Sequence, residues 1–186
     1  MIEDTAAPKA HGPYAVTAML SEGYRSLPRA ADERTTLESF LEWQRDTLAR
    51  KCDGLTAEQL RTRSAPPSPL SLLGLLRHMA DDERGWFRRT LGGQDLPSLY
   101  STDADPDGDF DNVDGADAAE GLTTWRAECE QSRGVIAGHA LDDIVHQKTG
   151  SAVSMRWIMT HMIEEYSRHN GHADLLRERI DGATGY

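Results

Sequence analysis

The segment VSMRWIMTHMIEEYSRHNGHADLLRERIDG, residues 153–182, decides the fold. Its apolar residues recur every three or four positions, which is the spacing of one face of an α-helix. Ser154 offers an N-cap at its start, and Gly182 offers the glycine that commonly follows a helix C-terminus. The segment therefore predicts one long amphipathic helix from just after Ser154 to about Ile180.

One face of this helix changes from apolar to ionisable and back. Steps of four and three from Ile158 lead through Met162, Glu165, His169, His172 and Leu176. Burying a carboxylate and two imidazoles is costly unless these groups are paired or bind a metal. Glu165 and His169 are four residues apart, so they can direct two donor atoms at one ion. His161 is also four residues from Glu165, and spacing alone leaves His161 and His172 open as donors.

A second amphipathic segment, LSLLGLLRHMADDERGWFRR at residues 70–89, predicts a facing helix over 71–91. Its apolar face consists of Leu72, Leu75, Leu76, Met79 and Trp86. His78 lies within this face and offers a third metal ligand. Asp82 follows four residues later, either as a further ligand or as an acceptor that orients the imidazole. Three protein ligands and one water are typical of catalytic zinc sites.

Capping signals predict two more helices before this one. Thr35 with Glu38 has the spacing of a capping box and predicts a helix that runs to about Lys51. Thr56 with Gln59 has the same spacing and predicts a short helix, which the proline-rich stretch that follows must end.

The remaining segments complete a bundle. A further long helix is expected over residues 117–139, and a small hairpin within residues 144–155. Four long amphipathic helices predict an all-α four-helix bundle with long crossover connections. Residues 1–34 lack periodicity and are expected to form a tail or strap, which leaves residues 35–182 as the bundle domain. Each long helix carries one tryptophan, and most of the four are expected to anchor the core.

Composition narrows the classes of function. The 186 residues suit one soluble domain, and the net charge of -11 disfavours binding to nucleic acids and to anionic membranes. The N-terminus has no signal-peptide pattern, and no apolar stretch approaches the roughly 20 residues that span a bilayer. Cys52 and Cys129 are expected to be free thiols, so a cytoplasmic location is the simplest interpretation.

Two charged segments have alternative interpretations. The acidic stretch partly matches a calcium loop, with ligand positions at Asp103, Asp105, Asp107 and Asp114 and a glycine at Gly108. Pro106 and the lack of a preceding helix favour a solvated acidic loop instead. A group of arginines on the second long helix is expected to pair with neighbouring acids rather than bind a substrate carboxylate; it consists of Arg77, Arg84, Arg88 and Arg89.

Together, the two quoted segments resemble the DinB-like superfamily over residues 35–182, and within it an actinobacterial subgroup of undefined function. The resemblance implies a four-helix bundle with a metal triad, one ligand on the second long helix and two, four residues apart, on the last. By position the triad falls on His78, Glu165 and His169, and His172 matches a histidine beside the triad.

The resemblance also implies a chemistry. Relatives include mycothiol-dependent maleylpyruvate isomerase and bacillithiol transferases, so we expect a metal-dependent transfer of a mycothiol-type thiol to a small electrophile. Zinc suits the ligand set best, with nickel or iron as alternatives. Relatives often form homodimers. The chain shows no counterpart of the isomerase's extra C-terminal domain, so isomerase activity is not expected. A non-catalytic metal- or ligand-binding bundle and a structural protein with a polar core cluster are the competing hypotheses.

Overall fold

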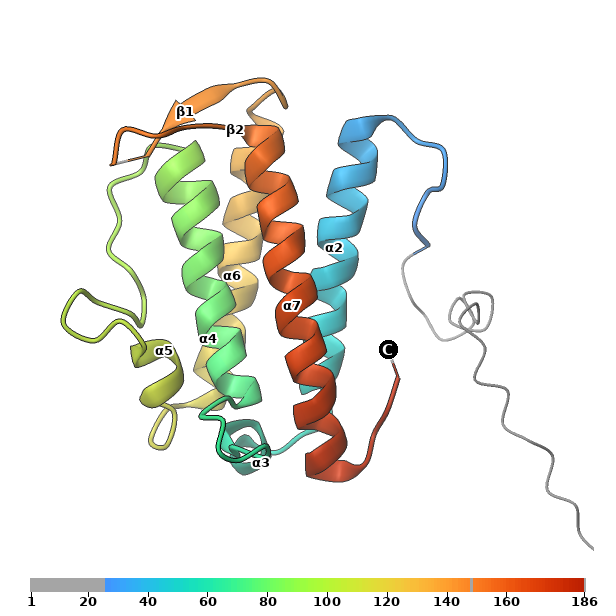
Figure 1. Ribbon diagram of the computed structural model, residues 1–186, viewed down its shortest axis with the longest axis vertical. Helices are drawn as coiled ribbons and strands as arrows, with labels where there is room; N and C mark the ends of the chain where they lie inside the picture. Colours follow the sequence, from blue (N-terminus) through green and yellow to red (C-terminus); the bar gives the residue numbers. More distant parts are fainter. Residues whose placement is uncertain (1–25, 148, 186) are drawn as a thin grey trace, which may run out of the picture.

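The computed structural model describes residues 26–147 and 149–185. The tail or strap expected over residues 1–34 lies mostly outside the described residues. Four long helices run side by side as a bundle: α2 (Glu33–Cys52), α4 (Leu72–Glu83), α6 (Ala118–Ala137) and α7 (Met155–Asp181) (Figure 1). The all-α bundle predicted from sequence is confirmed.

The helix ends are set by side chains that accept backbone N–H groups. Ser71 accepts from Gly74 at 3.0 Å at the start of α4, and Ser154 accepts from Trp157 at 3.1 Å at the start of α7. Both serines are N-caps, and the predicted capping box of α3 (Ala57–Arg61) is confirmed. At the other end of α7, Gly182 adopts a φ of 78°, which glycine tolerates without steric cost.

The predicted start of the first long helix is wrong. Asp32, not Thr35, is the N-cap of α2, and its carboxylate accepts the Thr35 N–H at 2.9 Å. Thr35 therefore lies inside the first turn, where its hydroxyl also contacts Asp32 at 2.7 Å. An aspartate is at least as good an N-cap as a threonine, and its negative charge suits the helix N-terminus.

The second long helix changes its hydrogen bonding part-way along. α4 ends at Glu83, and the chain continues as a π-helix, η1 (Arg84–Leu91). Its last turn includes the bond from the Gly92 N–H to the Phe87 carbonyl at 2.8 Å, five residues back. The single α-helix expected over residues 71–91 is therefore wrong in its last eight residues. A π-helical turn widens the helix and rotates the side chains that follow it.

The two long connections contain small elements. Between η1 and α6 the chain forms the single turn α5 (Gly108–Asp111), which lies beside α4 (Figure 1). Between α6 and α7 it forms an antiparallel hairpin of β1 (Ile144–His146) and β2 (Ala152–Ser154). The predicted hairpin is confirmed, and it covers one end of the bundle (Figure 1).

The core lies between the four helices and is mostly leucine and methionine. Trp125 is buried in it as expected, but Trp157 is 47% exposed, and Trp43 and Trp86 are half-buried. The expectation that most tryptophans anchor the core therefore holds fully only for Trp125. No helix of the described residues is long and apolar enough to cross a bilayer.

Candidate metal centre

Three ionisable side chains meet where α4 packs against α7. His78 comes from α4, and Glu165 and His169 come from α7; each offers a ligand atom within 4.8 Å of those of the other two. His169 Nε2 lies 3.5 Å from a Glu165 carboxylate oxygen. The His78 and His169 rings are 4.6 Å apart at an angle of 62°. Both helices carry apolar residues on either side of these positions, so core packing brings the polar side chains together.

Each imidazole has a partner on the side away from this centre. His78 Nδ1 lies 2.8 Å from an Asp109 carboxylate oxygen, and His169 Nδ1 lies 3.4 Å from His172 Nδ1. A partner on Nδ1 leaves Nε2 of each ring for the centre. Asp82 lies on the inner side, 3.4 Å from His78 Nε2, but it is not part of the convergent group.

Asp109 belongs to the acidic loop, and sequence reasoning missed it. Its side chain is buried against α4, and the neighbouring Phe110 ring lies 4.9 Å from the His78 ring. Phe110 can approach because α4 has a glycine there: a Cβ on Gly74 would lie 3.0 Å from the Phe110 ring. The apolar Phe110 within an acidic run was the available sign that this part of the loop packs on the bundle.

A second aspartate holds the loop on α4. Asp81 accepts three successive backbone N–H groups, from Leu99 at 2.5 Å, Tyr100 at 2.9 Å and Ser101 at 3.1 Å. Asp81 and His78 lie within one turn of the same helix. The carboxylate of Asp81 therefore fixes the start of the loop that returns Asp109 to His78.

Burial and neighbouring charges adjust the protonation of the centre. Burial, together with His78 and His172, lowers the pKa of His169 to about 4. Burial alone would lower the pKa of His78, but the hydrogen bond to Asp109 and the charge of Asp82 raise it. Burial raises the pKa of Asp82 to about 6. A neutral His169 keeps a lone pair free, and two imidazoles with one carboxylate are a donor set that suits a divalent metal such as zinc.

The comparisons with known proteins agree with this architecture. A family model described as mycothiol-S-transferase matches residues 36–182. The chain belongs to this family. It is a DinB-like family, as the two quoted segments suggested. No curated protein matches the sequence.

The fold is also found among solved structures. One example is the crystal structure of a conserved protein from Enterococcus faecalis, with a TM-score of 0.64 and 15% sequence identity. The match covers 83% of this chain and all of the other. At this identity the likeness shows the fold alone, and it gives the DinB-like bundle an experimental counterpart.

In this mycothiol-S-transferase family member, the other candidate donors lie at the edge of the centre. His161 forms a second group with Glu164 and Glu165, but its ring stacks on Trp157 at 4.8 Å. Arg168 contacts both glutamates, with Glu165 at 3.3 Å. His161 Nε2 is 4.0 Å from Glu165, and His172 lies behind His169. The structure therefore gives two candidate groups that share Glu165, one with His78 and His169 and one with His161 and Glu164.

The acidic loop is held by protein contacts. Asp114 pairs with Arg63, and Asp105 accepts from the Asn112 amide at 2.7 Å. Among the described residues, neither group of side chains close enough to hold a metal includes a member of the proposed calcium loop.

Two of the arginines on the second long helix pair as expected, since Arg84 and Arg88 both contact Glu128, at 2.6 and 3.0 Å.

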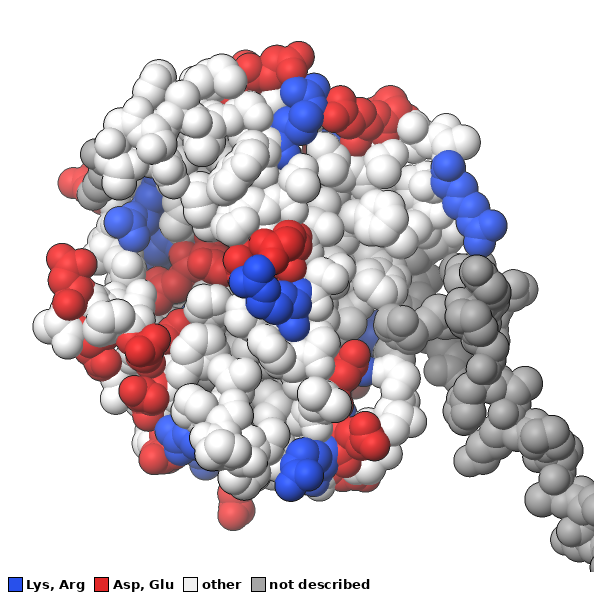
Figure 2. All heavy atoms as spheres, in the orientation of Figure 1, with Lys and Arg blue, Asp and Glu red and all other residues white. Residues whose placement is uncertain are grey.

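A pocket of about 290 Å³ opens beside His78, between α4 and the acidic loop. Most of its lining side chains are polar or charged; they include Asp81, Asp82, Arg89, Ser98, Ser101 and Asp107. Acidic side chains gather across the middle of the face that α4 and α7 present (Figure 2). The pocket borders the centre at His78, and its acidic lining suits an uncharged polar ligand better than an anion.

Proposed function

We propose that this protein is a metal-dependent S-transferase that joins a low-molecular-weight thiol of the mycothiol type to a small electrophile. The observation that carries the proposal is the convergence of His78, Glu165 and His169 on one point between α4 and α7. Membership of a family described as mycothiol-S-transferase supports the identity of the thiol.

The three side chains fit a divalent metal, and zinc is our proposal for it, with nickel or iron as alternatives. A divalent cation supplies positive charge that favours the thiolate form of a thiol. Glu165 is the one anionic ligand, so the ligand set leaves net positive charge at the centre. Asp109 and His172 hold the two imidazoles in the orientation that presents Nε2.

The pocket beside His78 is our proposal for the thiol site. Its hydroxyl and carboxylate side chains can hydrogen-bond a polar thiol, and Arg89 is its one arginine among the described residues. In the reaction, the thiol loses its proton to solvent, and the sulfur forms a bond to the electrophilic carbon. The electron pair of the broken bond leaves with the leaving group or, in an addition, moves onto the acceptor.

Metal content and thiol conjugation test the proposal together. The purified protein should contain about one equivalent of divalent metal, because three protein ligands and an open position hold a single ion. His169→Ala should lose the metal, whereas His146→Ala, at an exposed hairpin residue, should retain it. Conjugation of mycothiol to a fluorogenic alkyl halide should stop after chelation and return when zinc is added.

Two results would overturn parts of this proposal. If wild type and His169→Ala contain the same amount of metal, the proposed metal site is wrong. A bound metal with no conjugation of any low-molecular-weight thiol would leave the non-catalytic bundle as the better hypothesis.

We also propose a cytoplasmic location, supported by two free, buried cysteines. A homodimer stays a prediction from the resemblance, and sedimentation velocity would measure it.

A further inference from the structure

A second polar cluster lies in the core, on the same helices as the metal centre but formed by other side chains. Glu83 is fully buried, and its carboxylate accepts from Arg45 Nε at 2.8 Å and from Arg45 Nη2 at 2.7 Å. The same carboxylate accepts the Tyr166 hydroxyl at 2.7 Å. Tyr166 is itself fully buried and accepts from Trp125 Nε1 at 2.9 Å.

Each member of this cluster comes from a different helix. Arg45 lies on α2, Glu83 on α4, Trp125 on α6 and Tyr166 on α7. Tyr166 directly follows the candidate ligand Glu165 on α7, and Glu83 lies five residues after the candidate ligand His78 on α4. The hydrogen bond from Tyr166 to Glu83 therefore joins the two helices that carry the candidate ligands, at a point close to those ligands.

A buried hydrogen bond of this kind is sensitive to sliding. Shifting α7 along α4 by a single residue would move Tyr166 by about 1.5 Å and break a bond of 2.7 Å. The surrounding contacts between leucine and methionine side chains allow such shifts at lower cost, because apolar packing is not directional. Breaking the bond would leave a buried carboxylate with one partner fewer, which is expensive. The cluster thus favours one register of α4 against α7.

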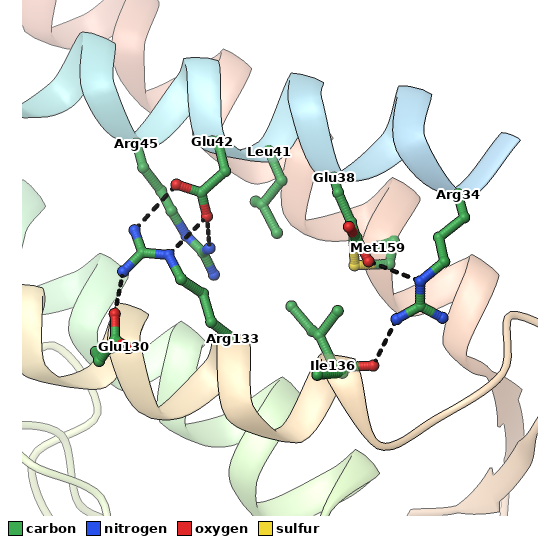
Figure 3. Close-up of a pocket in the computed structure, with 10 residues that line it drawn as sticks. Arg34, Glu38, Leu41, Glu42, Arg45, Glu130, Arg133, Ile136 and Met159 are labelled. Atoms are coloured by element: carbon green, nitrogen blue, oxygen red, sulfur yellow. Dashed lines mark hydrogen bonds and ion pairs between the residues drawn. The ribbon is translucent and has the colours of Figure 1, made fainter. Parts of the chain in front are cut away.

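Arg45 is fixed from its outer side as well. Glu42 accepts from Arg45 at 2.5 Å and also pairs with Arg133 on α6 at 3.0 Å. Figure 3 shows Glu42 between the two guanidinium groups, at the cavity of about 710 Å³ between α2 and α6. The chain of contacts runs from Arg133 through Glu42 and Arg45 to Glu83, so the Glu83 carboxylate has little freedom to follow a sliding helix.

We propose that Glu83 and Tyr166 are positioning residues for the metal centre. They fix the axial register of α4 against α7, and only that register brings His78 to Glu165 and His169. The proposal rests on the proposed metal site. Buried ion pairs often stabilise a protein less than apolar side chains of the same size would. The proposal therefore gives the Arg45–Glu83 pair a role in positioning rather than in stability.

Tyr166→Phe tests this with zinc alone as the probe. The variant removes one hydroxyl and keeps the ring, so the bundle should remain folded by circular dichroism. We expect zinc affinity, measured against a competing chelator, to fall about 10- to 100-fold, the usual effect of losing a group that orients ligands. With Co²⁺ in place of zinc, the visible absorption spectrum should also change, since it reports the geometry of the ligands. Leu60→Ala, on α3, is the matched control: it should lower stability and leave both readings unchanged.

A triple variant separates position from stability. Replacing the cluster by apolar groups of similar size, with Arg45→Met, Glu83→Met and Tyr166→Phe, is expected to keep or raise the melting temperature. Zinc affinity should nevertheless fall at least about tenfold. If both variants fold and bind zinc within twofold of wild type, the positioning role is wrong while the metal site stands. If wild type binds no zinc, the metal site itself is wrong and the positioning role falls with it.

Discussion

Asp109 accepts a hydrogen bond from His78 at 2.8 Å, although the two residues are 31 positions apart and on different elements. The side chain of Asp109 is 5% exposed and that of His78 is 25% exposed, so the bond is mostly buried. A carboxylate in this position selects the tautomer that presents Nε2 and makes that nitrogen a better donor. The loop between η1 and α6 therefore contributes to the centre even though it contains none of the three proposed ligands.

Asp109→Asn should weaken zinc binding without removing it. The amide keeps the size of the side chain and an acceptor oxygen, but it loses the charge that holds His78. We expect affinity to fall about 10- to 100-fold in a chelator competition assay. Asp111→Asn, an exposed residue of the same turn, is the control. Equal affinities in the two variants would show that Asp109 does not orient His78.

The cysteines of the chain should be unreactive in the native protein. Burial raises the pKa of Cys52 to about 12 and that of Cys129 higher still, so almost no thiolate forms near neutral pH. At pH 8, we expect a disulfide reagent to label neither residue quickly, and to release two thiols after denaturation. Fast labelling of the folded protein would contradict this, and would allow a cysteine of the chain to serve as the nucleophile.

The ligand-bearing faces of α4 and α7 could be predicted because they depend on local periodicity. A polar break in an apolar stripe is visible at fixed spacing, and His78, Glu165 and His169 lie at such breaks. Spacing could not choose among His161, Glu165, His169 and His172, because all four occupy neighbouring positions of one face. Their separate surroundings, such as the Trp157 ring against His161, depend on tertiary packing.

Other features could not be predicted because they depend on contacts between distant segments. Glu83 stands in the run Asp-Asp-Glu-Arg, residues 81–84, and nothing local indicates that it alone is fully buried. Asp109 reaches His78 only because the loop is pinned by Asp81 and packed on Gly74. The π-helical hydrogen bonding of η1 likewise has no local signal that distinguishes it from an α-helix.

Acid should destabilise the protein partly through Glu42. Burial alone would raise the pKa of this carboxyl, but hydrogen bonds from Arg133 and the charge of Arg45 hold it below the usual 4.5. As the pH falls below about 4.5, Glu42 is protonated in the unfolded chain before it is protonated in the folded one. The contribution of the Glu42 charge to stability is lost as the pH then falls through its pKa in the folded protein. We expect the difference in free energy of unfolding between wild type and Glu42→Gln to shrink as the pH falls below 4.5.

Glu38→Gln is the matched control for this pH dependence. Glu38 pairs with Arg34 on the same helix, but the two side chains are 41% and 34% exposed. The pair therefore contributes little to the free energy of unfolding. The free energy of unfolding of Glu38→Gln should differ little from that of wild type over the whole pH range. A Glu42→Gln difference that stays constant from pH 6 to pH 3 would show that the Glu42 charge is not what stabilises this end of the cluster.

Zinc should raise the melting temperature of the wild-type protein by mass action on the folded state. At a free concentration 100 times the dissociation constant, binding adds about 2.7 kcal/mol, which for a domain of this size corresponds to a rise of roughly 5–11 °C. His78→Ala removes a ligand and should abolish the rise. His172→Ala leaves all three ligands and should keep part of the rise, because His172 contacts the outer nitrogen of His169 and orients that ring without binding the metal. Scanning fluorimetry of the three proteins with and without zinc makes the measurement. A rise of the same size in His78→Ala would mean that zinc binds elsewhere, and would remove α4 from the metal centre.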